Sequence, residues 1–211
     1  MTVMTPEDVL SKAPVVPVVV IEDVRDALPL ARALLAGGLP VIEVTLRTDA
    51  ALEAIKLIAK EMPDAVIGAG TVLSPSQFDD VAKAGARFAI SPGATPALYT
   101  HAQAHRSMLA YLPGVASASE VMHGLDAGFD CFKLFPAEAV GGIPLLKSLA
   151  GPFPQARFCP TGGIHAGNAG QYLQLPNVLT VGGSWMVPVD AIQSRDWPRI
   201  QQLASEAAHL A

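Results

Sequence analysis

Short hydrophobic runs alternate with Ala-rich amphipathic stretches along this chain. The runs are rich in Val, Ile and Phe, as buried strands are, and the stretches between them have helical spacing. The runs are Val15–Ile21, Val41–Leu46, Ala65–Gly70, Phe88–Pro92, Met108–Pro113, Cys131–Pro136, Phe158–Thr161 and Leu179–Val181, and clear helical stretches are Asp23–Ala36, Asp49–Lys60 and Ser76–Ala84. Eight regularly spaced strand and helix units predict an α/β fold, a single closed (β/α)8 or TIM barrel.

A short helix is expected before the first strand. Thr5 can cap it and Pro6 can occupy its first turn, so we predict a helix over Thr5–Lys12 that closes the bottom of the barrel. No linker or low-complexity segment interrupts the chain, and residues 1–211 are therefore expected to form one domain. An open doubly wound sheet is the alternative. It usually carries a Gly-rich fingerprint after the first strand, whereas Ile21 is followed by Glu22-Asp23-Val24-Arg25, so we expect no nicotinamide, flavin or other cofactor.

Composition narrows the classes of partner. The 211 residues carry a formal net charge of -5 without clustered Lys and Arg, which argues against nucleic acid and anionic membranes as partners. No export signal and no membrane-spanning run is evident, so we predict a cytoplasmic protein. Only 16% of residues are charged, which hints that some apolar surface is covered by partner subunits. Cys131 and Cys159 are expected to be buried thiols rather than a disulfide.

Lys133 is the candidate nucleophile. It stands alone within the apolar run Cys131–Pro136, where burial favours the neutral amine, and a neutral amine can attack a carbonyl carbon to form a Schiff base. The alternative is a lysine whose head group reaches out to water from a strand end. The rest of the sequence decides between the two.

Alternation along the second predicted strand places Glu43 and Arg47 on the opposite face from Ile42, Val44 and Leu46. Glu43 and Arg47 are therefore expected at the barrel mouth, where active sites of such barrels lie. A buried Glu43–Arg47 ion pair is one interpretation. The other is proton transfer by Glu43 and binding of a substrate carboxylate by Arg47. The same alternation places Lys133 inside the barrel with Glu43.

Two glycine pairs follow the last two predicted strands. Gly162-Gly163 and Gly182-Gly183-Ser184 occupy the loops that usually bind phosphate in such barrels, where Gly lets backbone N–H groups approach the anion. Plain tight turns are the alternative. Thr71 and Pro92 also end strands, and without a ligand they would be a helix cap and a turn residue.

The histidines do not predict a metal site. His101 and His105 are spaced four apart on a predicted helix outside the barrel, and no acidic residue lies between or beside them in the sequence. We interpret them as a surface pair. His165, just beyond the seventh strand, is at most a contact at the rim.

Six strings together closely resemble the 2-keto-3-deoxy-6-phosphogluconate (KDPG) aldolase family, which also includes 4-hydroxy-2-oxoglutarate (KHG) aldolases. The resemblance covers nearly the whole chain, and the strings occur in order. They are Glu43–Thr48, Gly68–Leu73, Ile90–Gly93, Phe132–Glu138, Pro160–Ile164 and Gly182–Trp185.

The resemblance implies a class I aldolase that cleaves KDPG to pyruvate and glyceraldehyde 3-phosphate in the Entner–Doudoroff pathway, with 4-hydroxy-2-oxoglutarate as a further substrate. It implies Lys133 as the Schiff-base nucleophile and Glu43 as the general acid and base. The residues it places around the pyruvyl part of the substrate are Arg47, Thr71, Pro92, Thr161 and Phe135, and those it places at the phosphate are Gly162, Gly163, Gly183 and Ser184. It also implies a homotrimer.

Three alternatives remain open. The substrate could be the galactonate-derived epimer at C4, which differs in the orientation of one hydroxyl group. A phosphosugar isomerase or epimerase would share the barrel and the phosphate loops without forming an imine. A noncatalytic phosphate-binding barrel would leave Glu43, Arg47 and Lys133 without a task, although buried charges are costly.

Overall fold

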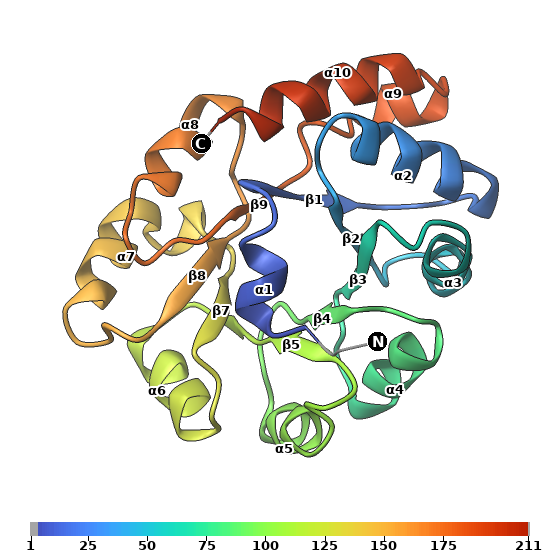
Figure 1. Cartoon of the computed structure of the whole chain (residues 1–211). Helices are drawn as coiled ribbons and strands as arrows, with labels where there is room; N and C mark the ends of the chain where they lie inside the picture. The colour runs from blue at the N-terminus through green and yellow to red at the C-terminus, as the bar shows by residue number, and fades with distance from the viewer. Residues whose placement is uncertain (1–3, 211) are drawn as a thin grey trace.

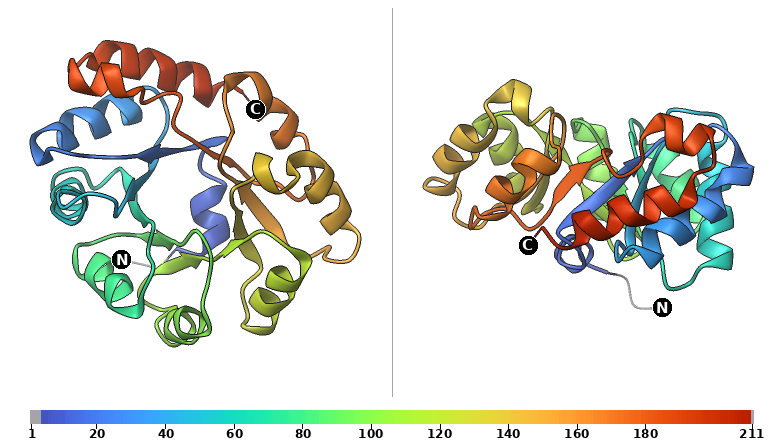
Figure 2. Two further views of the ribbon diagram at one scale, coloured as in Figure 1. Left: turned by 180° about the vertical axis from the view of Figure 1, so that it is seen from behind. Right: turned by 90° about the horizontal axis from the view of Figure 1, so that it is seen from above.

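The computed structural model describes residues 4–210, and in it parallel strands curl around a centre with helices outside (Figures 1 and 2). The strands are β1 Val15–Val19, β2 Val41–Thr45, β3 Val66–Gly70, β4 Phe88–Ile90, β5 Ala110–Leu112, β6 Gly114–Val115, β7 Cys131–Leu134, β8 Arg157–Pro160 and β9 Val181–Gly183. The helices are α1 Pro6–Leu10, α2 Ala27–Ala36, α3 Ala51–Glu61, α4 Pro75–Lys83, α5 Pro96–Ala104, α6 Ala118–Asp126, α7 Gly142–Ala150, α8 Ala166–Leu173, α9 Val189–Gln193 and α10 Trp197–Ala208, with short 3₁₀ turns at Val24–Asp26 and Glu138–Val140.

The strands form two parallel sheets. Six strands follow the order β5-β4-β3-β2-β1-β9, and three follow the order β6-β7-β8. The fifth predicted run, Met108–Pro113, contains β5 and ends at Pro113, which lacks an N–H, and the chain continues beyond it as the separate short strand β6, which was not predicted. The α/β class and the curled parallel sheet are confirmed, but the observed pairing is a six-stranded half-barrel and a small second sheet instead of one continuous ladder.

Two isolated bridges connect the ends of these sheets. Phe158 pairs with Val178 and Thr161 pairs with Gly182, both in parallel orientation. The backbone of Leu179 also donates a hydrogen bond of 3.1 Å to the carbonyl of Phe158. The edge of the three-stranded sheet that is formed by β8 therefore lies beside β9.

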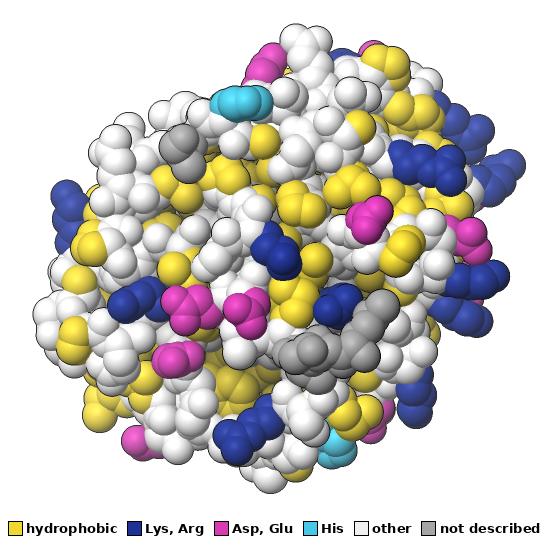
Figure 3. All heavy atoms as spheres, in the orientation of Figure 1, with side chains coloured by type: hydrophobic (Ala, Val, Ile, Leu, Met, Phe, Trp, Pro, Cys, Tyr) yellow, Lys and Arg dark blue, Asp and Glu magenta, His cyan; other side chains and the backbone are white. Residues whose placement is uncertain are grey.

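Helix α1 covers the N-terminal end of the strands. It is shorter than predicted, but Thr5 caps it as expected and forms a reciprocal capping box with Asp8. Val9 and Leu10 pack with inward side chains of the strands, such as Val16 and Val41. Figure 3 views this face, where acidic and basic side chains both interrupt the hydrophobic surface.

Strand alternation divides the core into two clusters. Ile42 and Val44 belong to the larger cluster, which packs the strands against the helices. Val41 and Cys131 belong to a smaller cluster inside the ring of strands. Side chains two positions beyond these inward residues therefore continue along the interior. This places residues 43 and 133 above the smaller cluster.

Within residues 4–210, no helix combines the length and the apolar character needed to cross a membrane.

Candidate active site

Lys133 and Glu43 meet inside the ring of strands although they come from β7 and β2. Lys133 Nζ donates a hydrogen bond of 3.0 Å to Glu43 Oε1. Their side chains are only 7% and 1% exposed, respectively. In so dry a setting a charged amine and a carboxylate stabilise each other, and a proton can also pass directly between them. The sequence prediction that these two residues share the interior is confirmed.

Register and small neighbours fix this pair. Glu43 lies opposite Gly68 on β3, and Lys133 lies between Gly114 on β6 and Cys159 on β8. Gly70, at the end of β3, leaves the space that the Glu43 carboxylate occupies. The sequence thus combines one acid, one amine and a set of glycines that make room for both.

Cys159 is the nearest alternative nucleophile on the neighbouring strand. Its side chain is buried, and burial raises the pKa of the thiol to about 12. At neutral pH it therefore stays a protonated thiol. Cys159 is therefore a weaker candidate nucleophile than Lys133.

Phe135 continues the same strand face beyond Lys133. Its ring centre lies 5.3 Å from Lys133 Nζ, within the range of a cation–π contact. Thr161 follows β8 and is buried, and its hydroxyl lies 3.9 Å from the Cys159 sulfur. Both residues therefore lie on the strand ends that flank the amine.

Thr71 has an unusual backbone at the end of β3. Its φ angle is 60°, in the left-handed region that a β-branched residue rarely adopts. Such strained residues are concentrated at functional sites. The next strand end carries Pro92, which is half-buried and whose carbonyl carbon would lie 2.3 Å from a Cβ at Gly114. The chain is thus tightly packed around these two strand ends.

The loop after β8 depends on its glycines. Gly162 and Gly163 have φ angles of +101° and +79°, which favour Gly. The Gly162 carbonyl accepts the Glu138 N–H at 3.1 Å, and the Gly163 carbonyl accepts Asn168 Nδ2 at 3.1 Å. These two hydrogen bonds fix the position of the loop just before helix α8.

The second glycine pair lies within β9 itself rather than in the loop after it as predicted, and this end of the strand is also restricted to small residues. A Cβ at Gly182 would lie 2.2 Å from the Thr161 hydroxyl, and one at Gly183 would lie 1.9 Å from the Trp185 ring. Ser184 follows and is exposed. The two glycine pairs are therefore neighbours in space, joined by the bridge between Thr161 and Gly182.

Arg47 does not lie where strand alternation puts it. Strand β2 ends at Thr45, and the Arg47 N–H donates to the Thr45 carbonyl at 2.8 Å, which turns the chain. The interpretation of a buried Glu43–Arg47 ion pair is wrong, because the partner of Glu43 is Lys133 and Arg47 is exposed. Arg47 instead lines a cavity of about 510 Å³ together with Ser184 and Glu22.

Sequence reasoning also missed contacts between residues far apart in the chain. Asp79 on α4 lies 2.7 Å from His101, so the two histidines do have an acidic neighbour. His101 is only 20% exposed and packs edge-on against Phe78, which corrects its assignment to the solvent-facing surface. His165 has a local role as the cap of α8, where its Nδ1 accepts the Gly167 N–H at 3.1 Å.

The sequence is similar to those of known aldolases over nearly its whole length. The sequence profile of the aldolase family "KDPG and KHG aldolase" matches residues 7–203. The 2-dehydro-3-deoxy-phosphogluconate aldolase of Pseudoalteromonas atlantica is 55% identical over 201 residues, which are 95% of this chain and 93% of that protein.

Two solved structures show the same fold. KDPG aldolase from Legionella pneumophila, with pyruvate captured at low pH as a covalent carbinolamine intermediate, superposes with a TM-score of 0.95 at 53% identity, covering 97% of this chain and 98% of that one. The 2-keto-3-deoxy-6-phosphogluconate aldolase of Zymomonas mobilis with 3-phosphoglycerate has a TM-score of 0.92 at 54% identity, covering 97% and 95%.

Proposed function

The chain belongs to the KDPG and KHG aldolase family, and on that premise we propose that it is a class I aldolase that cleaves KDPG to pyruvate and glyceraldehyde 3-phosphate. The observation that carries the proposal is the buried hydrogen bond between Lys133 and Glu43. The covalent pyruvate adduct of the similar Legionella protein supports the same chemistry. 4-Hydroxy-2-oxoglutarate is proposed as a further substrate, cleaved to pyruvate and glyoxylate.

The first stage is imine formation. Glu43 accepts a proton from Lys133, and the neutral amine attacks the keto carbon of the substrate. A C–N bond forms, and a second proton moves from the attacking nitrogen to the carbonyl oxygen, which becomes a hydroxyl group. Glu43 then returns a proton to that hydroxyl group, which leaves as water. The product is a positively charged iminium on Lys133.

The second stage breaks the carbon–carbon bond. Removal of the C4 hydroxyl proton, by Glu43 or a water it holds, forms the aldehyde carbonyl, and the electrons of the C3–C4 bond flow to the iminium nitrogen. The resulting enamine takes a proton at C3. Water then hydrolyses the iminium, which releases pyruvate and restores the Lys133 amine.

The substrate is proposed to lie across the strand ends. Thr71, Pro92, Thr161 and Phe135 surround the pyruvyl part, which attaches to Lys133. Arg47 binds the substrate carboxylate, for which its forked guanidinium is suited. The backbone of Gly162, Gly163 and Gly183 and the side chain of Ser184 bind the phosphate. The bridge that joins Thr161, next to the first glycine pair, to Gly182 of the second pair supports this assignment.

We further propose that the two sheets close into one (β/α)8 barrel, which makes residues 1–211 a single domain. The isolated bridges Phe158–Val178 and Thr161–Gly182, which join the stretches that contain β8 and β9, support closure on one side. On the other side, β5 and β6 are parts of one extended stretch on either side of Pro113. Hydrogen exchange should then protect β7 and β2 together, and protection lost separately in the smaller sheet would contradict a single barrel.

A cytoplasmic homotrimer is proposed as the working form. Cys131 and Cys159 are free thiols, as is usual in reducing compartments. The low share of charged residues, 16% of the chain, supports an apolar surface covered by other subunits. Light scattering coupled to gel filtration should give three times the chain mass of 21.9 kDa, and a monomer mass would reject the trimer.

Borohydride reduction tests the central proposal. With pyruvate present, it should add a pyruvyl-sized mass to the peptide that contains Lys133 and stop aldol cleavage. An isomerase or epimerase forms no imine and would show no adduct. A labelled peptide elsewhere would reject Lys133 as the nucleophile. Parallel assays of KDPG, its C4 epimer and 4-hydroxy-2-oxoglutarate identify the preferred substrate.

A further inference from the structure

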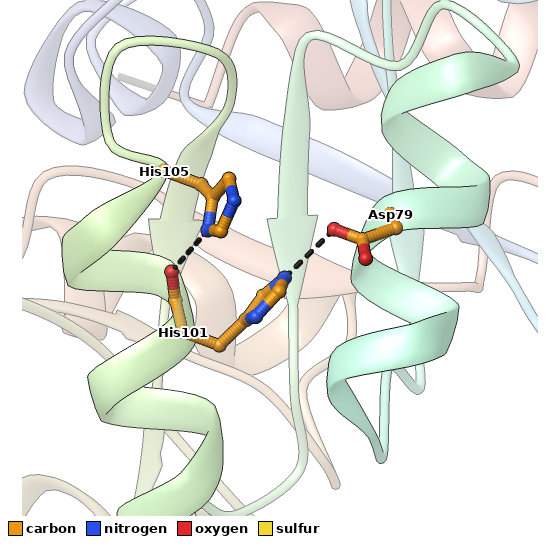
Figure 4. A group of neighbouring side chains, drawn as sticks. All are labelled: Asp79, His101 and His105. Carbon is orange, nitrogen blue, oxygen red and sulfur yellow. Dashed lines mark hydrogen bonds and ion pairs between the residues drawn. The ribbon is translucent and has the colours of Figure 1, made fainter.

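Three potential metal ligands meet on the outer surface, between helices α4 and α5. Asp79 lies on α4 and His101 on α5, and His105 is the C-cap residue directly after α5 (Figure 4). One ligand atom from each residue can be chosen so that all lie within 4.8 Å of one another. Among the residues that the structure describes, this is the one such group of three or more His, Cys, Asp and Glu side chains.

The hydrogen bond of His105 determines where its proton lies. Its Nδ1 is 2.8 Å from the His101 carbonyl oxygen, and because a carbonyl only accepts, Nδ1 carries the proton. In the neutral ring Nε2 then has a free lone pair. A backbone carbonyl on the second ring nitrogen is the usual support of a metal-binding histidine.

His101 and Asp79 complete the group. Their contact of 2.7 Å joins His101 Nε2 to Asp79 Oδ1, so one proton now occupies the place that a cation could take. The His101 ring is held by edge-on packing against Phe78, with ring centres 5.5 Å apart. It also stacks on His105 at 4.2 Å, which keeps both imidazoles on one side of α5.

We propose that Asp79, His101 and His105 bind one divalent transition-metal ion. Two imidazoles and one carboxylate suit Zn²⁺ better than Mg²⁺ or Ca²⁺, which prefer oxygen ligands. Bonds of about 2.0–2.1 Å in a tetrahedron place ligand atoms about 3.3 Å apart. The ligand atoms lie within 4.8 Å of one another before any ion binds, so small side-chain movements reach this geometry, and water can supply the fourth ligand because Asp79 is 39% exposed.

The metal would join α4 to α5. It takes the place of the proton between His101 Nε2 and Asp79, the neutral His101 ring then carries its one proton on Nδ1, and three coordinate bonds replace one hydrogen bond. Since it binds the folded chain, it should raise the unfolding temperature as its concentration rises. The group lies on outer helices whereas Lys133 lies inside the ring of strands, so this inference is independent of the proposed aldolase reaction.

Calorimetric titration of the whole, chelator-treated protein with Zn²⁺ tests the site. Wild type should bind one ion per chain and show a higher unfolding temperature with Zn²⁺. Asp79→Asn and His105→Gln should each weaken binding by at least about tenfold. Both residues are partly exposed, so the variants should remain folded.

His209→Gln is the matched control. His209 Nδ1 lies 2.6 Å from the Ser205 carbonyl, the same i,i−4 arrangement as in His105, but His209 belongs to no such ligand group within residues 4–210. This variant should bind Zn²⁺ like wild type. Absence of heat and of a thermal shift, or equal binding by all three variants, would overturn the proposal, whether or not the protein cleaves KDPG.

Discussion

Gly70 lies so close to Glu43 that a Cβ atom at position 70 would come within 2.0 Å of Glu43 Oε1, the oxygen that accepts the Lys133 hydrogen bond. The same added carbon would lie 2.7 Å from Glu43 Cδ. The backbone at Gly70 is not in the left-handed region, so only space excludes a side chain there. Position 70 therefore controls where the carboxylate lies.

Gly70→Ala should move the Glu43 carboxylate away from Lys133 and slow the reaction. Displacement of a catalytic group by about 1 Å can cost about 100-fold in rate, and we expect a loss of kcat of that order. Gly170→Ala is the control, because nothing lies within 4 Å of its added Cβ on α8. Steady-state cleavage assays measure kcat of both variants, and circular dichroism confirms that both are folded. Unchanged turnover in Gly70→Ala would show that Glu43 need not occupy its present position.

Lys133→Met should abolish cleavage and borohydride labelling. It also leaves the Glu43 carboxylate buried without its partner, and breaking a buried pair in this way typically costs about 3–5 kcal/mol of the free energy of unfolding. The double variant Lys133→Met, Glu43→Gln removes the unpaired charge and should recover part of that stability. Urea unfolding of the three proteins measures this. Equal stability of the single and double variants would mean that the carboxylate is not charged and unpaired in Lys133→Met.

Glu43→Gln should separate catalysis from binding. Glutamine still accepts a hydrogen bond from Lys133 but cannot take up its proton, so kcat should fall by about 100- to 10,000-fold with a small change in KM. Slower imine formation should also appear as slower borohydride labelling at Lys133. If kcat matched that of wild type, another group would have to move the protons.

The sequence could predict the Lys133–Glu43 pair because both residues lie within regular strands, where side chains alternate strictly. The same rule failed for Arg47, because the chain turns after Thr45 and alternation stops with the strand. Strand β6 was not predicted, because the hydrophobic run ends at Pro113 and the two residues Gly114–Val115 are too short to form a recognisable run of their own. Side-chain alternation therefore predicts the position of a residue only as far as the strand itself extends.

The periodicity of hydrophobic residues does not predict which side chains of two different helices come into contact. His101 and Asp79 are 22 positions apart, and their meeting depends on how α4 packs beside α5. The left-handed backbone of Thr71 carries no sequence signature, since Gly or Asn is the usual residue there. The glycine pairs were found because they lie at the carboxyl ends of the last two strands, a position that the regular strand spacing predicts, although the second pair belongs to β9 itself.

Alkaline pH should destabilise the fold through its two cysteines. Burial raises the pKa of Cys131 and of Cys159 to about 12, from 9.0 for a free thiol. Between these values the unfolded thiols lose protons while the folded ones keep them, so the folded state binds more protons and the free energy of unfolding falls as pH rises. Each thiol contributes up to about 1.4 kcal/mol per pH unit.

Urea unfolding at several pH values between about 8 and 10 measures this slope. Tyr99, whose pKa burial raises to about 12, adds a loss in the same direction only above its ordinary value of 10.0. The double variant Cys131→Ala, Cys159→Ala should therefore have a shallower slope than wild type between pH 9 and 10, whatever its absolute stability. Identical slopes would contradict the prediction, because they would mean that the thiols ionise equally in the folded and unfolded chains.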